Sequence, residues 1–289
     1  MTTAPAENTT TNPQAVVLIT GTSSGIGLHT AVAAARAGPT VVATMRNLEG
    51  GRALRDAAEA AGVTLDIRRL DVTDAASVIE VVAEVVDRYG RLDALVNNAG
   101  SGHVGTIENE SIDQVRAVME VNFFGVVALT RAALPHLRIS RGRLITVSSV
   151  GGVIGQPFNE AYCAAKFAVE GFMESLAPVA RTAGVSVTVV EPGAVATSFV
   201  DNVGFDLAAT PAFGDPYAAG LAAYLARAGS SFAEAQSAES AGAVVAALLD
   251  GDAPPFRVQT SDAARQFVGV KLADLDGAAV QRLTGGWLA

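Results

Sequence analysis

The chain is poor in the residues that build metal centres, disulfides and nucleic-acid interfaces. One of its 289 residues is cysteine and three are histidine. A single cysteine cannot form an internal disulfide, and three scattered histidines supply no ligand cluster, so we expect neither a disulfide nor a metal. Acidic residues outnumber basic ones by 29 to 20, which gives a formal net charge of −9. We therefore expect no nucleic-acid partner and no attraction to an anionic membrane surface.

Charged residues are scarce as a whole, at 17% of the chain, whereas 50% of it is hydrophobic. This composition can bury one large core, and we expect a single domain over residues 14–289. The stretch 1–13 is small, polar and rich in threonine, with no basic start and no apolar centre. It predicts a disordered tail rather than a signal peptide. No apolar run approaches the ~20 residues that a membrane-spanning helix needs, which predicts a cytoplasmic protein.

Strand-like apolar runs alternate with longer helical runs along the chain. The strands are expected near residues 15–20, 40–45, 64–70, 92–97, 142–148, 185–191 and 255–260. Repeated βαβ units of this kind predict an α/β fold of the Rossmann type, a doubly wound parallel sheet of about seven strands with helices on both faces. Ligands of such sheets bind beyond the carboxyl ends of the strands. The long stretch at about 198–235 is predicted to form a substrate lid over that crevice.

A glycine-rich turn joins the first predicted strand to an alanine-rich helix. The turn reads G-T-S-S-G-I-G, and the residues expected at a phosphate are Gly21, Ser23, Ser24, Gly25, Ile26 and Gly27. Glycine permits the tight turn and the close approach of backbone to a pyrophosphate, and the helix N-terminus supplies N–H groups and a positive dipole end. The pattern predicts a dinucleotide site; an ordinary glycine-rich βα turn is the alternative.

Tyr162 and Lys166 stand four positions apart in a run with helical spacing, so both side chains leave one face of the same helix. A neighbouring positive charge favours the phenolate and is expected to lower the tyrosine pKa from ~10 toward working pH. The pair predicts an acid/base catalyst. The alternative is an amphipathic helix with a solvated lysine and a half-buried tyrosine.

With these two motifs the chain resembles the short-chain dehydrogenase/reductase family, in particular its single-domain subclass and the branch of the 17β-hydroxysteroid and retinol dehydrogenases. Further motifs of that family follow in order: Asp71-Val72, N-N-A-G at 97–100, Asn122, Ser149 thirteen residues before Tyr162, and P-G-A-V-A-T at 192–197. The resemblance implies a catalytic set of Asn122, Ser149, Tyr162 and Lys166. It also implies cofactor contacts from Tyr162, Lys166, Asp71, Val72, Asn98, Ala99, Gly100, Pro192, Gly193, Val195 and Thr197.

The roles implied by the resemblance follow the charge that develops during hydride transfer. Tyr162 donates a proton to the substrate oxygen and Ser149 hydrogen-bonds to the same oxygen. Lys166 lowers the Tyr162 pKa and holds the nicotinamide ribose, while Asn122 keeps a water that links Lys166 to solvent. Asp71 and Val72 are expected at the adenine.

The end of the second strand predicts the cofactor. An NAD-preferring site usually has an acidic residue there, whereas this chain has Met45 followed by Arg46. Arg46 can pair with a 2′-phosphate, so NADP(H) is favoured over NAD(H). The alternative is an Arg46 that stacks on the adenine or faces water.

Apolar residues near the expected crevice suggest a lipophilic ketone or secondary alcohol as substrate, with core or lid packing as the alternative. They are Val150, Val153, Phe158, Phe199, Phe205 and Phe213. The sequence thus predicts an NADP(H)-dependent oxidoreductase, and the family suggests a homodimer or homotetramer. A non-catalytic NADP(H)-binding sensor or scaffold and a sugar-nucleotide epimerase or dehydratase are the alternatives. Cys163 is expected to be a buried structural thiol, and His103 either a structural residue or a substrate contact.

Overall fold

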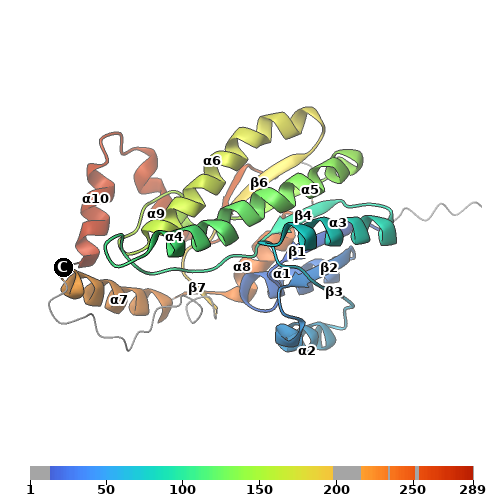
Figure 1. The fold of residues 1–289 in the computed structure, drawn as a ribbon, viewed down its shortest axis with the longest axis horizontal. Coiled ribbons are helices and arrows are strands. Elements are labelled where there is room, and N and C mark those ends of the chain that lie inside the picture. The colour runs from blue at the N-terminus through green and yellow to red at the C-terminus, as the bar shows by residue number, and fades with distance from the viewer. Residues whose placement is uncertain (1–13, 198–215, 234, 251–253, 289) are drawn as a thin grey trace, which may run out of the picture.

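The computed structural model describes residues 14–197, 216–233, 235–250 and 254–288. A parallel sheet of seven strands forms its centre (Figure 1). In spatial order the strands are β3 (Asp66–Arg69), β2 (Thr40–Met45), β1 (Val16–Thr20), β4 (Ala94–Asn97), β5 (Arg143–Val147), β6 (Ser186–Glu191) and β9 (Arg257–Gln259). Every neighbouring pair is parallel. The predicted doubly wound α/β fold is confirmed.

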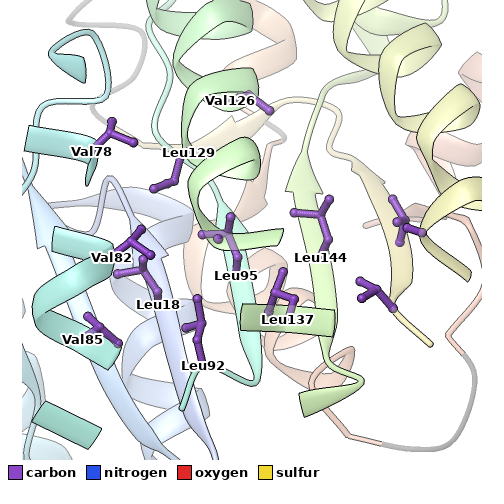
Figure 2. Packing of buried hydrophobic residues seen from close by; sticks show 14 of the residues in the cluster. Leu18, Val78, Val82, Val85, Leu92, Leu95, Val126, Leu129, Leu137 and Leu144 are labelled. Carbon is purple, nitrogen blue, oxygen red and sulfur yellow. The ribbon is translucent and has the colours of Figure 1, made fainter. Parts of the chain in front are cut away.

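Helices cover both faces of the sheet, because successive side chains of each strand point to opposite faces. Val16 and Leu18 of β1 face one layer, made by α3 (Ala75–Tyr89), α5 (Gly125–Ser140) and α6 (Glu160–Thr182). Figure 2 shows this layer, with Val82 of α3 beside Leu18 of β1 and with Leu129 of α5 in the same cluster. The other face carries α1 (Gly25–Arg36), α2 (Arg52–Ala61) and α8 (Ala238–Ala247).

The remaining helices lie toward one end of the molecule, at the left of Figure 1. They are α4 (Ile112–Met119), α7 (Ala218–Ala233), α9 (Asp262–Leu272) and α10 (Ala278–Gly285). Short 3-10 turns occur at η1 (Leu48–Gly51), η3 (Val150–Gly152) and η4 (Gly286–Leu288). A small parallel pair, β7 (Val195–Ala196) with β8 (Gln236–Ser237), was not expected from the sequence, since two-residue strands carry no periodicity.

A π-helical turn, η2 (Glu120–Phe124), joins α4 to α5 without a break in the helix. The combined stretch Ile112–Ser140 is by length and composition apolar enough to cross a membrane. The expectation that no run approaches this length was therefore wrong, because α4, η2 and α5 form one continuous helix. Its buried face, with Leu129, Ala133 and Leu137, packs against the sheet.

Two expectations fall largely outside the described residues. The predicted tail at 1–13 lies there entirely, and so does the part of the predicted lid at 198–215. The described remainder of the lid region is mostly the helix α7.

Candidate active site

The glycine turn after β1 has a backbone that only glycine adopts readily. Gly21 and Gly25 have φ angles of +67° and +57°. A Cβ on Gly27 would lie 2.3 Å from the Gly21 carbonyl oxygen, and a Cβ on Gly21 would lie 2.8 Å from the Ala99 Cα. Ser24 precedes α1 in an extended conformation and its side chain does not cap that helix. The turn therefore presents backbone at the N-terminus of α1.

The end of β4 clamps this turn. Asn98 Nδ2 donates to the carbonyl oxygens of Thr20 and Gly21, at 2.9 and 3.0 Å. Thr20 Oγ1 accepts hydrogen bonds from the backbone N–H groups of Asn98 and Ala99, both at 2.9 Å. Asn98 and Ala99 thus lie against the glycine turn, and the Asn98 amide holds that turn in place.

Gly100 marks the place where Asn122 and Lys166 meet. A Cβ on Gly100 would lie 2.9 Å from Asn122 Oδ1 and 3.6 Å from Lys166 Nζ. Lys166 is only 4% exposed, and its Nζ donates to the Val147 carbonyl at 3.1 Å. The structure therefore brings together two members of the expected catalytic set beside the end of β4.

Asn122 lies inside the π-helical turn η2 and is fully buried. Its Oδ1 accepts from the Ser101 N–H at 3.2 Å, and its Nδ2 donates to the carbonyls of Ser101 and Val118, both at 3.0 Å. A π turn adds a residue to the helix and is common at functional sites. Here it directs the Asn122 amide at the loop that follows β4.

Ser149 and Tyr162 meet across the end of β5. Ser149 Oγ accepts a hydrogen bond from the Gly151 N–H at 3.0 Å and is hydrogen-bonded to Tyr162. Lys166 Nζ lies 5.8 Å from the centroid of the Tyr162 ring. The four expected catalytic residues thus occupy one region, on η2, on the turn between β5 and η3, and on α6.

The Tyr162 pKa moves in the direction opposite to the one expected from the sequence. Burial raises the pKa of Tyr162 to about 12, although the hydrogen bond with Ser149 opposes the rise. Burial also lowers the pKa of Lys166 to about 8, against the attraction of Glu170. The expected lowering of the tyrosine pKa is therefore wrong for this structure, because removal of the phenol from water is the largest influence on that pKa.

The ends of β2 and β3 place Arg46 beside Asp71. Met45 is 3% exposed and belongs to the core, so Arg46 is the first exposed residue after β2. Burial alone would raise the pKa of Asp71, but hydrogen bonds from Thr73 and the charge of Arg46 outweigh it and the pKa is lowered. Val72 packs on the start of α5 instead of pointing outward.

The segment after β6 returns to the glycine turn. The Pro192 carbonyl accepts from the Val150 N–H at 2.9 Å. Thr197 lies against Gly25, where a Cβ would approach its Cγ2 to 3.1 Å. Gly193 lies between them in sequence beside Ala264 of α9, and Val195 opens β7. The predicted cofactor residues from β1, β4 and β6 therefore converge.

Sequence reasoning named Phe158, Val150 and Val153 but missed the residues that pack against them. Phe158 packs with Tyr224 of α7 and with Trp287 of η4. Val150 packs with Ala264 and Val268 of α9, with Val153 beside them. Tyr224 lies close enough to Tyr162 to raise its pKa. No spacing rule connects the C-terminal helices to η3, so only the folded chain reveals this contact. The residues Phe199, Phe205 and Phe213 lie outside the described part.

His103, whose role the sequence left open, has a defined partner, and Cys163 is buried as expected. His103 Nε2 lies 2.9 Å from Glu110 Oε1, both largely buried. Cys163 is buried, and burial raises the pKa of its thiol to about 11, which disfavours the reactive thiolate.

A family model described as short chain dehydrogenase matches residues 15–207 of this chain. The chain belongs to the short-chain dehydrogenase/reductase family. Retinol dehydrogenase 8 of Bos taurus is 37% identical over 276 residues, which cover 90% of this chain and 86% of that protein. Estradiol 17-beta-dehydrogenase 1 of Rattus norvegicus is 45% identical over 195 residues, 65% of this chain. The match spans 56% of the rat protein's length. The resemblance to the hydroxysteroid and retinol dehydrogenase branch is confirmed.

Solved structures of short-chain dehydrogenases share the fold. One from Streptomyces avermitilis aligns with a TM-score of 0.78 at 32% identity, over 96% of this chain and 99% of that chain. One from Burkholderia phymatum in complex with NAD has a TM-score of 0.77 at 26% identity, over 91% and 94%. A variant of actinorhodin polyketide ketoreductase with NADPH has a TM-score of 0.73 at 29% identity, over 85% and 95%. Both nicotinamide cofactors thus occur among these neighbours.

Proposed function

We propose that this short-chain dehydrogenase/reductase is an NADP(H)-dependent oxidoreductase that interconverts a lipophilic ketone and a secondary alcohol. The observation that carries the proposal is the hydrogen-bonded pair of Ser149 and Tyr162, with Lys166 buried beside it, next to the glycine turn. A phenol, a hydroxyl and an ammonium so arranged can supply a proton and hydrogen bonds to one oxygen atom.

The residues present fit a dinucleotide. A Cβ on Gly21 or Gly27 would overlap neighbouring protein atoms, so glycine is what allows this tight turn to form directly before α1. The turn thereby presents the backbone N–H groups of the helix N-terminus, which suit a phosphate. In the proposal this turn holds the pyrophosphate, Arg46 and Asp71 the adenosine end, and Lys166 the nicotinamide ribose. The bound nicotinamide supplies the hydride-transfer chemistry.

The charge state of Tyr162 supports reduction as the favoured direction. With a pKa near 12, Tyr162 keeps its proton throughout the neutral range and is ready to donate it to an oxygen that gathers negative charge. Ser149 stabilises the same oxygen with a hydrogen bond. Asn122 and Lys166, which both border Gly100, would return the proton through water. Oxidation would first require loss of the tyrosine proton.

The apolar wall supports a lipophilic substrate. Phe158, Tyr224 and Trp287 form one apolar cluster, and Val150 with Val268 forms another beside it. Val150 opens η3 directly after Ser149, and the residues that pack with it and with Phe158 come from α7, α9 and η4. The relatives named estradiol 17-beta-dehydrogenase and retinol dehydrogenase are in keeping with this substrate class.

Oxidation of NADPH and NADH, followed by absorbance, tests the proposed function against a panel of keto-steroids, retinal and aryl ketones. We expect turnover with NADPH and at least one lipophilic carbonyl compound. If the protein binds NADPH but oxidises it with no compound in the panel, a non-catalytic binder replaces the proposal.

The cofactor preference depends on Arg46. Arg46→Ala is expected to weaken NADPH binding by about tenfold to a hundredfold, since a hydrogen bond to a charged group contributes about 1.5–3 kcal/mol. NADH binding should change little, because NADH has no 2′-phosphate. Titration of cofactor fluorescence measures both dissociation constants. Arg69→Ala is the matched control, because Arg69 is also exposed and also influences Asp71. An equal loss of both cofactors would show that Arg46 does not recognise the phosphate.

A further inference from the structure

A cluster of charged side chains lies behind the catalytic lysine and has no part in the mechanism above. Glu170 follows Lys166 by one helical turn in α6 and is 5% exposed, and Glu191 at the end of β6 is 0% exposed. Arg257 of β9 reaches both carboxylates. Its Nε lies 3.3 Å from Glu170 Oε2 and 3.3 Å from Glu191 Oε1. Two buried acids therefore share one guanidinium nitrogen.

Further contacts fix the cluster from two sides. Gln259 Nε2 donates to Glu191 Oε2 at 2.8 Å, so the second acid is held by β9. Ser148, which precedes the catalytic Ser149, contacts Glu170 with its hydroxyl. A Cβ on Gly152 would lie 2.6 Å from Ser148 Oγ and 3.0 Å from both Glu170 Cγ and the Lys166 carbonyl oxygen. The cluster is thus packed directly against the turn that carries the catalytic serine.

Glu170 changes its charge near neutral pH. Burial raises its pKa to about 7; Ser148 opposes this, Glu191 adds to it, and Arg257 opposes it. The charged groups around Glu170 are Lys166 and Glu174 from α6, Glu191 from β6 and Arg257 from β9. Of these, Lys166 is the group that the proposed reaction uses.

The pKa of Glu170, about 7, is lower than that of Lys166, about 8, and this order couples the two groups. Burial lowers the pKa of Lys166 to about 8, and the only charge that raises it is Glu170 among the described residues. As the pH rises through 7, Glu170 becomes a carboxylate before Lys166 would lose its proton. The new negative charge then opposes the loss of that proton.

We propose that Glu170 is a positioning residue which keeps Lys166 charged beside Tyr162, while Glu191 and Arg257 hold the Glu170 carboxyl in place. The effect of Glu170 on turnover rests on the proposed function. The effect of Glu170 on the charge of Lys166 does not, so each claim can be tested and can fail separately.

The chain offers a direct readout, because Lys166 and Lys271 are its two lysines. Protein labelled with ¹³C at the lysine ε-carbon will give two resonances, and Lys271→Arg assigns them. Titration of the Lys166 resonance with pH measures its pKa in the unchanged protein and in Glu170→Gln. We expect a pKa lower by about one unit in the variant, or about tenfold in proton affinity, because a nearby opposite charge is removed.

Glu174→Gln is the matched control. Glu174 lies one turn further along α6, is exposed, and also pairs with Arg257, at 2.8 Å. The Lys166 pKa should stay unchanged in this variant. An unchanged Lys166 pKa in Glu170→Gln, or the same shift in both variants, would overturn the proposal.

Turnover separates this inference from the proposed function. In the unchanged protein and in Glu170→Gln, the pH above which NADPH oxidation declines should follow the Lys166 pKa. If the resonance shifts but the unchanged protein reduces no carbonyl compound, the proposed function fails and the role of Glu170 toward Lys166 stands. If turnover declines at the same pH in both proteins although the resonance shifts, Lys166 does not set the alkaline limit and the catalytic consequence is wrong.

A second variant covers the case in which Glu170→Gln does not fold. Arg257→Gln leaves Glu170 in place but removes the cation that lowers its pKa. Glu170 would then keep its proton to a higher pH and carry less negative charge beside Lys166. The Lys166 pKa should therefore fall. A rise, which is the direct effect of losing a positive charge nearby, would overturn the proposal.

Discussion

Tyr162→Phe is expected to reduce turnover of the best carbonyl substrate by about 10²- to 10⁴-fold, the range for loss of a general acid. The phenol is hydrogen-bonded to Ser149 and holds its proton with a pKa near 12. Phenylalanine keeps the ring and its packing but has no proton to donate. NADPH binding should change much less than turnover. Steady-state oxidation of NADPH gives the first quantity and fluorescence titration the second.

Tyr224→Phe provides the control for this prediction. Tyr224 is a buried tyrosine near Tyr162, and its hydroxyl is engaged with Asn159. Its loss should alter substrate affinity more than the rate of the chemical step. If Tyr162→Phe retained more than a few per cent of turnover while Tyr224→Phe lost most of it, the acid would have been assigned to the wrong tyrosine.

Gly27→Ala is expected to abolish measurable cofactor binding and to lower the free energy of unfolding by about 1–3 kcal/mol, the usual cost of overpacking. The new Cβ would lie 2.3 Å from both the Gly21 carbonyl oxygen and Asn98 Nδ2. The first is backbone and the second holds the turn to β4, so neither can move without opening the cradle. Urea unfolding and NADPH titration measure the two effects.

Gly171→Ala is the matched control for the glycine turn. Gly171 lies in α6, and a Cβ there would meet nothing within 4 Å. Alanine should therefore be neutral or stabilise the protein by about 0.5 kcal/mol. Unaltered NADPH affinity in Gly27→Ala would mean that the turn does not cradle the pyrophosphate.

The sheet could be predicted because its five inner strands are almost wholly buried and are nearly continuous in apolar residues. The run L-I-T-V in β5 is an example, and all seven predicted strands occur in the sheet. The ends of the strands were predicted less accurately: β3 begins at Asp66, two residues later than expected. The glycine turn and the Tyr162–Lys166 spacing were also readable, because both are local patterns.

Features that depend on distant contacts could not be read in the same way. The Tyr162 pKa is set mainly by burial, to which Tyr224 of α7 adds, and the Tyr–Lys spacing reports neither effect. Glu170 could have been noticed as an acidic residue four positions after Lys166, but its partners Glu191 and Arg257 come from two other strands. The oligomeric state, the cytoplasmic location and the single-domain boundary stay predictions.

The position of β9 has a consequence for how the protein is made. This strand is at the edge of the sheet beside β6, and its Arg257 comes 87 positions after Glu170. A chain emerging from the ribosome completes the glycine turn, Ser149, Tyr162 and Lys166 long before it contains Arg257. Until then two buried carboxylates lack their shared cation. The nascent chain therefore contains Ser149, Tyr162 and Lys166 before it contains the cation that Glu170 and Glu191 share. Synthesis must pass residue 257 before the charges around the site are complete.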